Sequence, residues 1–521
     1  MAFSTFAAID VGSNEVSMKI YEISKNGIHV LDFVRQTLEL GSQTYSNGNI
    51  SRDRTGQLCT ILKDFQRKMK EYHVENFRAC ATSALREANN QLLVLDQIRL
   101  STGIEVDVLS NSQQRFFSFM ALAMKVKEFP EIIEKGTAIA DVGSGNIQIS
   151  LFHKQALVIS QNLKLGSLRL RELLGDMENR TDNYNQLLSE YIDHEMETFG
   201  KVYLRDVSFG NKGLFSIRNL IGVGDHLKQI MYYLKPEKTD SDIRAVTKEE
   251  FERIFHMISH TSIEELSEVH GISKEQASLI LPTVMIYQTL FERTRAEVLW
   301  MLDMNLCDGI VAEYAVSKGL LQSDHDFTQD IINSARNIAY RYQSNTSHVE
   351  FMEKAALAIY EPIARSHGLG ARERLLLQIA VILHDCGEFI NMNETRLNSY
   401  RIISTTELIG LSDLEREMTA RIVAYASNGK ENGNNETRLG RRNQLIVAKL
   451  SAILELADAL DKSHLQKCKR IESDRRENKL VITLYSLQDM TLERELFERN
   501  SAVFEDVFGL RIQLKQKKKT I

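Results

Sequence analysis

Ala8-Ile9-Asp10-Val11-Gly12-Ser13-Asn14 is the stretch that decides the fold, because a near copy, Ala140-Asp141-Val142-Gly143-Ser144-Gly145-Asn146, follows later in the chain. After each copy, apolar residues fall on alternate positions, which predicts a strand, a turn and a second strand. Glycine lets a turn approach a ligand closely, and successive backbone N–H groups can surround a phosphate. Two such turns facing each other would form a phosphate clamp with additional donors from the side chains of Ser13, Asn14, Ser144 and Asn146.

Length and composition limit the class of protein. The 521 residues exceed a single hydrophobic core and indicate several domains. The net charge of −6 gives no overall attraction to nucleic acid or anionic lipid, so we expect neither a specific nucleic-acid partner nor a membrane partner. The five cysteines lack CxxC spacing, and neither a signal segment nor a membrane-spanning stretch stands out. We therefore expect a soluble, cytoplasmic protein.

Two helix starts between the repeated turns carry residues that could act on a phosphate. The run 82–88 begins a helix whose first turn contains Arg86, which could bind phosphate bidentately or could be a solvated helix arginine. After an alternating strand at 104–109, Ser110 and Asn111 are possible caps of a second helix. Gln113 and Gln114 then lie in its first turn.

Several motifs in this order resemble the exopolyphosphatase/guanosine-pentaphosphate phosphatase (Ppx/GppA) family. They are the two turns at 10–14 and 141–145, Ala-Thr-Ser-Ala-Leu-Arg-Glu-Ala at 81–88, Thr-Gly-Ile at 102–104 and Leu-Gly-Ser-Leu-Arg-Leu at 165–170. The resemblance implies an actin-like (ribonuclease H-like) α/β fold in two halves, with a phosphate chain bound in the cleft between them. It also implies that a helical domain of HD type follows.

The sequence departs from the family pattern at its acidic positions. Where the family has two adjacent acids, this chain has Gln113 and Gln114, and Gln148 replaces the glutamate that follows the second turn. The Gly-Gly-Thr run of the family aligns with Gly222-Val223-Gly224-Asp225, and its Arg-Glu-Gly with Ser317-Lys318-Gly319. These departures fall where the resemblance places catalysis.

A glutamine can orient a water molecule, but it cannot accept the proton of that water near pH 7 or offer Mg²⁺ a negative charge. Loss of general-base help costs roughly 10²- to 10⁴-fold in rate. Asp10 and Asp141 are retained, so contact with Mg²⁺ or water from the two strand ends remains possible. Another acid, such as Glu15 or Glu87, could have taken over proton transfer.

The last third of the chain reads as helical and then returns to strand alternation. Before it, Asp308-Gly309 ahead of Ile310-Val311-Ala312 predicts a turn into a closing strand. The order of His348, His384, Asp385 and Asp458 resembles the metal-binding set of HD-domain phosphohydrolases, which implies a divalent transition metal, although such domains can also be purely structural. We interpret Asp461 and His464 as surface residues that flank this set.

The sequence therefore predicts four domains: actin-like halves at 1–125 and 126–321, an all-α HD-type domain at 322–468, and a small α+β domain at 469–521. We expect an exopolyphosphatase-like hydrolase that binds inorganic polyphosphate or (p)ppGpp with weakened catalysis, and we expect a homodimer. The alternatives are a non-catalytic regulator that binds the same ligands and a metal-dependent HD phosphohydrolase. Catalytic positions would be Asp10, Asp141, Gln113, Gln114 and Gln148; phosphate would be bound by Gly12, Ser13, Asn14, Arg86, Gly143, Ser144, Gly145 and Asn146.

Overall fold

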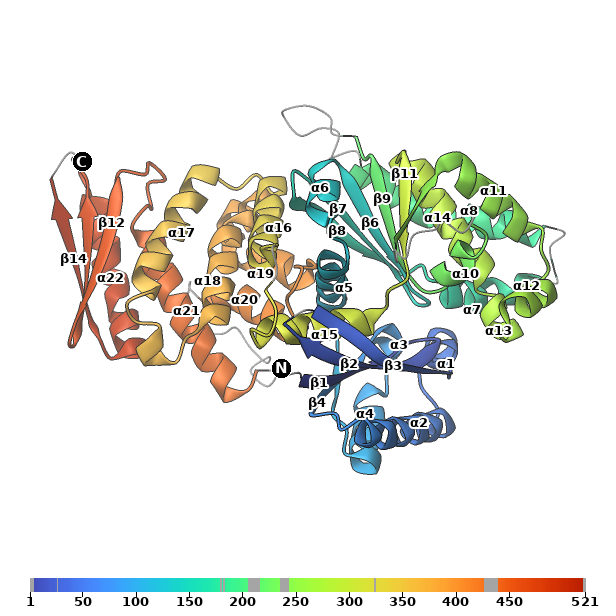
Figure 1. The fold of residues 1–521 in the computed structure, drawn as a ribbon. Helices are drawn as coiled ribbons and strands as arrows, with labels where there is room; N and C mark the ends of the chain where they lie inside the picture. Colours follow the sequence, from blue (N-terminus) through green and yellow to red (C-terminus); the bar gives the residue numbers. More distant parts are fainter. Residues whose placement is uncertain are drawn as a thin grey trace. The chain divides into compact units, whose positions relative to one another are not determined.

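Each repeated stretch forms a strand that ends in the turn of a β-hairpin. In the computed structural model, β1 (Ser4–Val11) pairs antiparallel with β2 (Glu15–Ser24), which places Asp10 opposite Ser17. β6 (Thr137–Val142) pairs in the same way with β7 (Ile147–His153), which places Asp141 opposite Gln148. The strand, turn and strand expected from the repeat are thus present twice (Figure 1).

The structure describes residues 4–25, 27–178, 180, 183–204, 216–234, 243–322, 325–425 and 439–518. The chain divides into two units, Met1–Phe327 and Thr328–Ile521. The first unit contains both hairpins, each in a mixed sheet of its own. Among the helices in the described ranges, none is both long enough and apolar enough to span a membrane.

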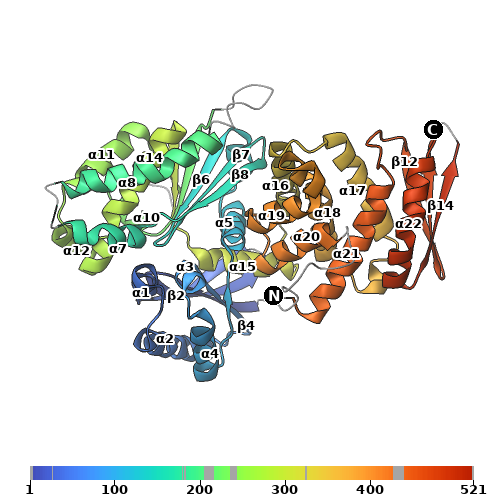
Figure 2. The ribbon, with the colours of Figure 1, turned by 180° about the vertical axis from the view of Figure 1, so that it is seen from behind.

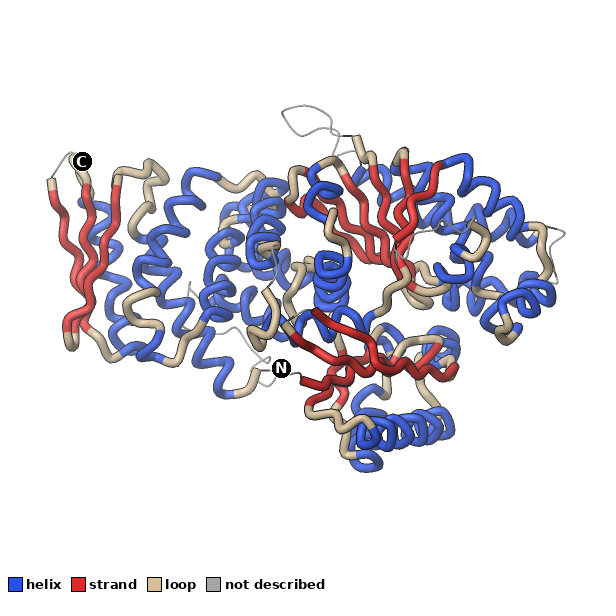
Figure 3. Tube along the Cα trace, in the orientation of Figure 1, coloured by secondary structure: helices blue, strands red, loops and turns tan. Residues whose placement is uncertain are grey.

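The two sheets of the first unit share one strand order. The first sheet runs β3-β2-β1-β4-β5, where β3 is Gly27–Thr37, β4 is Asn76–Ala81 and β5 is Val106–Val108. The second runs β8-β7-β6-β9-β11-β10, with β8 at Ala156–Leu163, β9 at Asn219–Gly224, β11 at Val298–Leu302 and β10 at Ile243–Thr247. In both sheets, which are red in Figure 3, a three-stranded antiparallel part is followed by two strands parallel to β1 or β6. The second sheet has one further strand at its edge, β10, which pairs antiparallel with β11.

Both faces of β1 are buried, so this strand lies in the middle of its half. Ala7, Ile9 and Val11 belong to the core that α2 (Arg52–Glu71) and α4 (Gln91–Thr102) cover. Phe6 and Ala8 belong to a second core on the opposite face, shared with α5 (Asn111–Lys125). In the second sheet, α7 (Ser167–Glu178), α8 (Tyr184–Phe199), α11 (Lys248–Ser259) and α14 (Ile280–Thr294) contribute to one large core (Figure 2).

The turn and strand expected at 308–312 is wrong, because these residues belong to α15 (Leu306–Ser317). Gly309 is required by a helix crossing rather than by a turn: a Cβ on it would lie 2.5 Å from the carbonyl oxygen of Phe117 in α5. The β-branched residues Ile310 and Val311 are buried against the first sheet. Although α15 falls within the range 126–321, it therefore packs on the sheet of the first half.

Asp308 anchors α15 through a buried cluster of charged and polar groups. Its carboxylate accepts hydrogen bonds from Lys19 Nζ at 2.8 Å, from Tyr21 Oη at 3.0 Å and from the backbone N–H of Asn305 at 3.0 Å. Lys125 Nζ of α5 lies 3.4 Å away. Burial opposes ionisation of Asp308, but the charges of Lys19 and Lys125 outweigh it and lower the pKa of Asp308.

The second unit is helical for most of its length. It contains α16 (Phe327–Arg341), α17 (Thr346–Tyr360), α18 (Ala371–Leu383), α19 (Thr395–Thr405), α20 (Asp413–Tyr425) and α21 (Arg441–Ala459). A three-stranded sheet follows, formed by β12 (Arg470–Arg476), β13 (Lys479–Tyr485) and β14 (Arg511–Lys517). Helix α22 (Thr491–Phe508) packs on both α21 and β14, which joins this sheet to the helices.

Replacing Asp308 with asparagine should lower the free energy of unfolding by about 3–5 kcal/mol at pH 7, because it leaves Lys19 buried without its counter-charge. Since the folded pKa of Asp308 is lowered, the charge contribution is present above the unfolded value of about 4 and is lost as the pH falls through the folded pKa. Urea denaturation of both proteins at pH 7 and below pH 4 measures this. The exposed Asp303 provides the control: Asp303→Asn should change stability by less than about 0.5 kcal/mol. Equal stability of Asp308→Asn and wild type at pH 7 would contradict the role given to the cluster.

Candidate functional site

One cavity of about 70 Å³ is lined by both hairpin turns. From the first turn it takes Gly12, Ser13 and Asn14, and from the second it takes Gly143, Ser144, Gly145 and Asn146. Asp10 and Asp141, which precede the last residue of β1 and β6, also line it. The equivalent ends of two similar sheets therefore meet at one place.

A third strand end contributes an acid to the second turn. Asp225 follows Gly224 at the end of β9 and lines the cavity. Its Oδ2 atom accepts a hydrogen bond from the backbone N–H of Ser144 at 2.9 Å and another from Ser144 Oγ at 2.5 Å. One amide of the second turn is therefore already bound to a carboxylate of the protein. The sequence showed 222–225 only as a glycine turn. An acid close to a glycine at the end of a strand, as at Asp10 and Asp141, was the available signal.

Four carboxyl groups line the cavity: Asp10, Glu15, Asp141 and Asp225. None of the described lining residues is a lysine, arginine or histidine. Burial and then the charge of Asp225 raise the pKa of Glu15 to about 7, although Arg35 opposes this shift. Burial also raises the pKa of Asp141 to about 6, against the hydrogen bond from Ser118. The pKa of Asp10 is raised well above its ordinary value by burial and by the neighbouring Asp225 and Glu15.

This donor set fits a hard divalent cation. Buried carboxylates that raise one another's pKa are stabilised when a cation lies between them, and Mg²⁺ prefers oxygen ligands. Buried oxygens of several lining residues, among them Asp10 Oδ1, Asn14 Oδ1 and Gln114 Oε1, have no hydrogen-bond partner among the described residues. The cavity thus combines negative charge with polar atoms that are available to a ligand.

The hydroxyl groups of the first turn are engaged with one another. Tyr45 Oη, from α1 (Leu40–Asn47), lies 2.7 Å from Ser13 Oγ and 3.0 Å from Ser83 Oγ. Ser13 Oγ and Ser83 Oγ are 2.9 Å apart. A phosphate that reached Ser13 would therefore meet the tyrosine hydroxyl, a group that no pattern in the sequence placed here.

Three residues expected in the site do not line the cavity. Gln113 is part of the cap of α5: its Oε1 accepts a hydrogen bond from the backbone N–H of Ser110 at 3.1 Å. Arg86 donates to the carbonyl oxygen of Leu109 at 2.7 Å and to Asn111 Oδ1. Gln148 is buried, and neither polar atom of its side chain has a partner among the described residues. By contrast, Gln114 lines the cavity.

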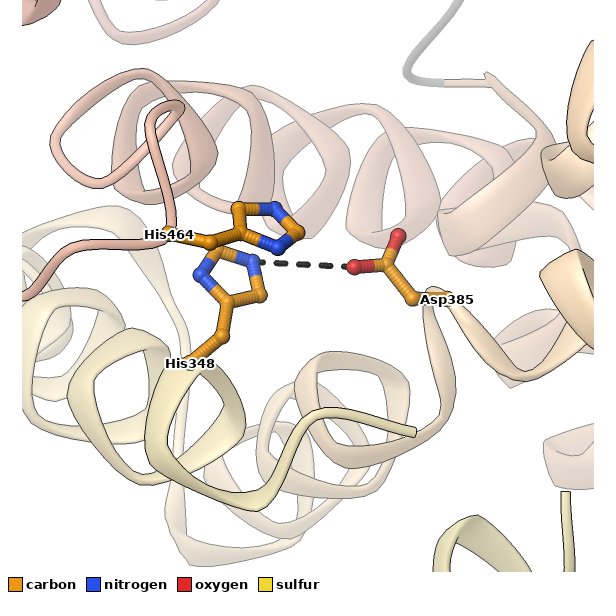
Figure 4. A group of neighbouring side chains, drawn as sticks. All are labelled: His348, Asp385 and His464. Atoms are coloured by element: carbon orange, nitrogen blue, oxygen red, sulfur yellow. Dashed lines mark ion pairs between the residues drawn. The ribbon is translucent and has the colours of Figure 1, made fainter. Parts of the chain in front are cut away.

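The second unit brings together a separate cluster of histidine and aspartate. His348 of α17 and His384, which follows α18, have their Nε2 atoms 3.3 Å apart. Asp385 Oδ2 lies 3.6 Å from His348 Nε2, as drawn in Figure 4, and 3.1 Å from His384 Nε2. A carboxylate oxygen of Asp458, at the end of α21, lies within 4.8 Å of a ring nitrogen of each histidine. All four residues expected there from the sequence therefore lie in one cluster.

The other nitrogen of each imidazole faces an acceptor. His348 Nδ1 lies 2.8 Å from Asp461 Oδ2, and His384 Nδ1 lies 2.7 Å from the carbonyl oxygen of Val381. When both Nδ1 atoms carry the proton, as these acceptors favour, the two Nε2 lone pairs face each other. A metal ion or a proton between the two nitrogens would relieve the repulsion of these lone pairs. Metal-binding histidines commonly have this kind of second partner.

The expectation that Asp461 and His464 are surface residues is wrong. Asp461 is 1% exposed and binds His348, while the ring of His464 stacks on that of His348 with centroids 3.7 Å apart. The reason is local: after α21 ends at Ala459, the chain turns back, and His464 takes a left-handed φ of 53° that directs it inward. His464, His348 and Asp385 form a second group with ligand spacing (Figure 4).

Basic side chains already pair with Asp458. Lys462 Nζ lies 3.0 Å from its Oδ2, and Arg396 Nη2 lies 3.4 Å from the same atom. Arg396 also binds Glu455. A metal ion bound through Asp458 would therefore compete with two cations, whereas one bound through His348, Asp385 and His464 would not share this carboxylate.

Comparison with known proteins identifies the relatives of both units. The family model "Ppx/GppA phosphatase family" matches residues 19–318, and "Ppx/GppA phosphatase, domain III" matches residues 332–501. Guanosine-5'-triphosphate,3'-diphosphate pyrophosphatase of Photobacterium profundum is 20% identical over 491 residues, which cover 92% of this chain and 91% of that protein. Exopolyphosphatase 1 of Mycobacterium tuberculosis is 22% identical over 311 residues, covering 58% and 86% respectively.

Solved structures show the fold of the first unit. An exopolyphosphatase from Cytophaga hutchinsonii matches with a TM-score of 0.52 and 17% identity, covering 61% of this chain and 98% of that one. The Aquifex aeolicus member of the Ppx/GppA protein family matches with a TM-score of 0.50 and 20% identity, covering 61% and 99%. The duplicated mixed sheets are thus those of the actin-like fold. Because a family model matches more than half of its residues, the chain belongs to the Ppx/GppA phosphatase family.

Proposed function

We propose that the cavity between the hairpin turns binds the terminal phosphate of inorganic polyphosphate or of a guanosine polyphosphate, and that hydrolysis there is weak. The observation that carries this proposal is that both glycine turns line one cavity. Backbone N–H groups of such turns and the side chains of Ser13 and Asn14 would provide donors for phosphate oxygens, whereas the side-chain amide of Asn146 already donates to Asn111 and Asn162. The names of the relatives, a pyrophosphatase acting on a guanosine nucleotide and an exopolyphosphatase, support the same substrate class.

Magnesium would complete the site by offsetting the negative charge of both protein and phosphate. Asp10 and Asp141 would hold it, with Asp225 and Glu15 close by, because these are the carboxyl groups that line the cavity. When bound, the cation would neutralise charge on the phosphate to be released. The turns would position the terminal phosphate. A further group would have to accept the proton of the attacking water.

The weak step is proton acceptance. Gln114 lines the cavity where the family pattern has an acid, and a neutral amide cannot take a proton from water near pH 7. Gln148, opposite Asp141 in the hairpin, has likewise replaced an acid. Glu87, one of the two replacement acids considered from the sequence, is bound by Arg169 at 2.7 and 2.9 Å, whereas Glu15 lines the cavity. With a glutamine at the position expected for the proton acceptor, we expect ligand binding with slow or absent formation of orthophosphate. The expected homodimer stays a prediction.

Restoring two acids should increase hydrolysis. Gln114→Glu combined with Gln148→Glu should raise the release of orthophosphate from long-chain polyphosphate with Mg²⁺ by roughly 10²- to 10⁴-fold, the usual contribution of a general base. Gln113→Glu is the matched control, because a glutamate there can keep the helix cap and should leave the rate unchanged.

Three outcomes, from this assay and from calorimetric measurement of ligand binding, bear on the proposal. A wild-type protein that turns over at ordinary enzyme rates, and loses this activity on Asp141→Ala, would contradict weak hydrolysis. Binding of polyphosphate or (p)ppGpp by calorimetry, with no product from wild type or from the restored variant, would leave the non-catalytic regulator as the function. No binding of either ligand would end the proposal for this cavity.

A second candidate function, a metal-dependent HD phosphohydrolase, is favoured by one observation in the second unit. The Nε2 atoms of His348 and His384 lie 3.3 Å apart beside Asp385, while their Nδ1 atoms face acceptors. Imidazole with carboxylate suits a divalent transition metal such as Mn²⁺ or Zn²⁺. When bound, this metal would supply an activated water, and His348, His384 and Asp385 would hold it with either Asp458 or His464.

The metal site can be tested without an activity assay. Protein purified without chelators should contain close to one transition metal per chain, and His348→Ala should reduce this content at least roughly tenfold. The exposed histidine His29 provides the control, since His29→Ala should leave the metal content unchanged. A wild-type protein that neither contains a transition metal nor gains phosphatase activity with Mn²⁺ would exclude this function.

A further inference from the structure

Arg169 of α7 joins the two halves at the edge of the cavity. Its Nε donates a hydrogen bond at 2.7 Å to the carbonyl oxygen of Gly145, a lining residue of the second turn. Its Nη2 donates at 2.7 and 2.9 Å to the two carboxylate oxygens of Glu87, which belongs to the first half. The guanidinium also lies 3.9 Å from the ring centroid of Tyr45. One arginine therefore contacts the second turn, an acid and the aromatic ring of the first half.

Charge makes this position important for an anionic ligand. The described residues that line the cavity include four carboxyl groups and no basic side chain. A phosphate chain carries several negative charges, so the phosphates beyond the terminal one need a cation outside this lining. Arg169 is bonded directly to a lining residue, whereas Arg86 is bonded to Leu109 and Asn111. The guanidinium of Arg169 is thus well placed for the next phosphate.

In the structure the carboxylate of Glu87 binds the guanidinium of Arg169, as a phosphate group could. Carboxylate and phosphate offer arginine similar acceptor oxygens, and a phosphate group carries more charge. The side chains of Arg169 and Glu87 are 18% and 24% exposed, so water reaches the pair and exchange of one acceptor for another is possible. Tyr45, whose ring contacts the guanidinium of Arg169, also forms hydrogen bonds through its hydroxyl group with Ser13 and Ser83.

We propose that Glu87 is an internal substitute for substrate, and that a phosphate chain displaces it from Arg169 when it enters the cavity. Arg169 then binds the second phosphate, while the turns bind the first. The exchange makes the site selective for chains over single phosphates, because orthophosphate gains nothing from Arg169. This inference rests on the proposed function, since it concerns the same ligand at the same cavity.

The chain contains a matched control for this exchange. Arg171, two residues further along α7, forms a second ion pair between the halves, with Glu39 at 3.0 Å. If the role of these pairs is only to hold the halves together, Glu39→Gln and Glu87→Gln should have similar effects. If Glu87 competes with substrate, only Glu87→Gln should strengthen binding.

The experiment is calorimetric titration of tripolyphosphate and of orthophosphate, with Mg²⁺, into the full chain. Glu87→Gln should tighten tripolyphosphate binding by roughly tenfold, since it removes a charged competitor, and should leave orthophosphate binding unchanged. Arg169→Gln should weaken tripolyphosphate binding by a similar factor. In the double variant the gain from Glu87→Gln should disappear, because no guanidinium remains to be released.

Two results would overturn the inference while leaving the proposed function in place. One is binding of tripolyphosphate that responds equally to Glu87→Gln and Glu39→Gln. The other is a gain from Glu87→Gln that persists without Arg169. Absence of tripolyphosphate and long-chain polyphosphate binding in wild type and in Glu87→Gln, with urea midpoints showing that both are folded, would instead overturn the proposed function, and the inference with it.

Discussion

The site depends on how closely the two turns approach each other. A Cβ on Gly145 would lie 2.0 Å from Tyr45 Oη and 2.3 Å from Ser83 Oγ, so the second turn can reach the first only because this position has no side chain. The contact brings the ends of β1 and β6 to one cavity, and with them Asp10 and Asp141. Any larger residue at 145 would separate the halves or displace Tyr45.

The close approach determines the electrostatics. Acids that would be solvated on separate strand ends become buried neighbours, which raises the pKa of Asp10, Glu15 and Asp141. Three positions where the family pattern has acids are glutamines here, yet the cavity is lined by four carboxyl groups, those of Asp10, Glu15, Asp141 and Asp225. The cavity therefore carries several carboxyl groups although these three positions are neutral.

In the histidine and aspartate cluster of the second unit, neighbouring groups also determine how the side chains face one another. Each imidazole is oriented by an acceptor at Nδ1, Asp461 for His348 and the carbonyl of Val381 for His384, and this leaves the Nε2 atoms directed at one point. Asp458, however, is shared with Lys462 and Arg396. The acceptors at Nδ1 thus orient the two imidazoles in a way that favours binding of a metal ion, whereas the ion pairs of Asp458 with Lys462 and Arg396 oppose it.

The sequence by itself determined the two hairpins, the pairing of Asp10 and Asp141 with glycine turns, and the four residues of the histidine and aspartate cluster, because each is encoded by residues adjacent in the chain or by a family motif. Only the tertiary structure separated Gln114, which lines the cavity, from Gln113, which caps α5. It also placed Tyr45, Asp225 and Arg169 at the cavity, made α15 a helix and turned Asp461 inward. These outcomes depend on contacts between segments far apart in the chain, whose energies local periodicity does not contain.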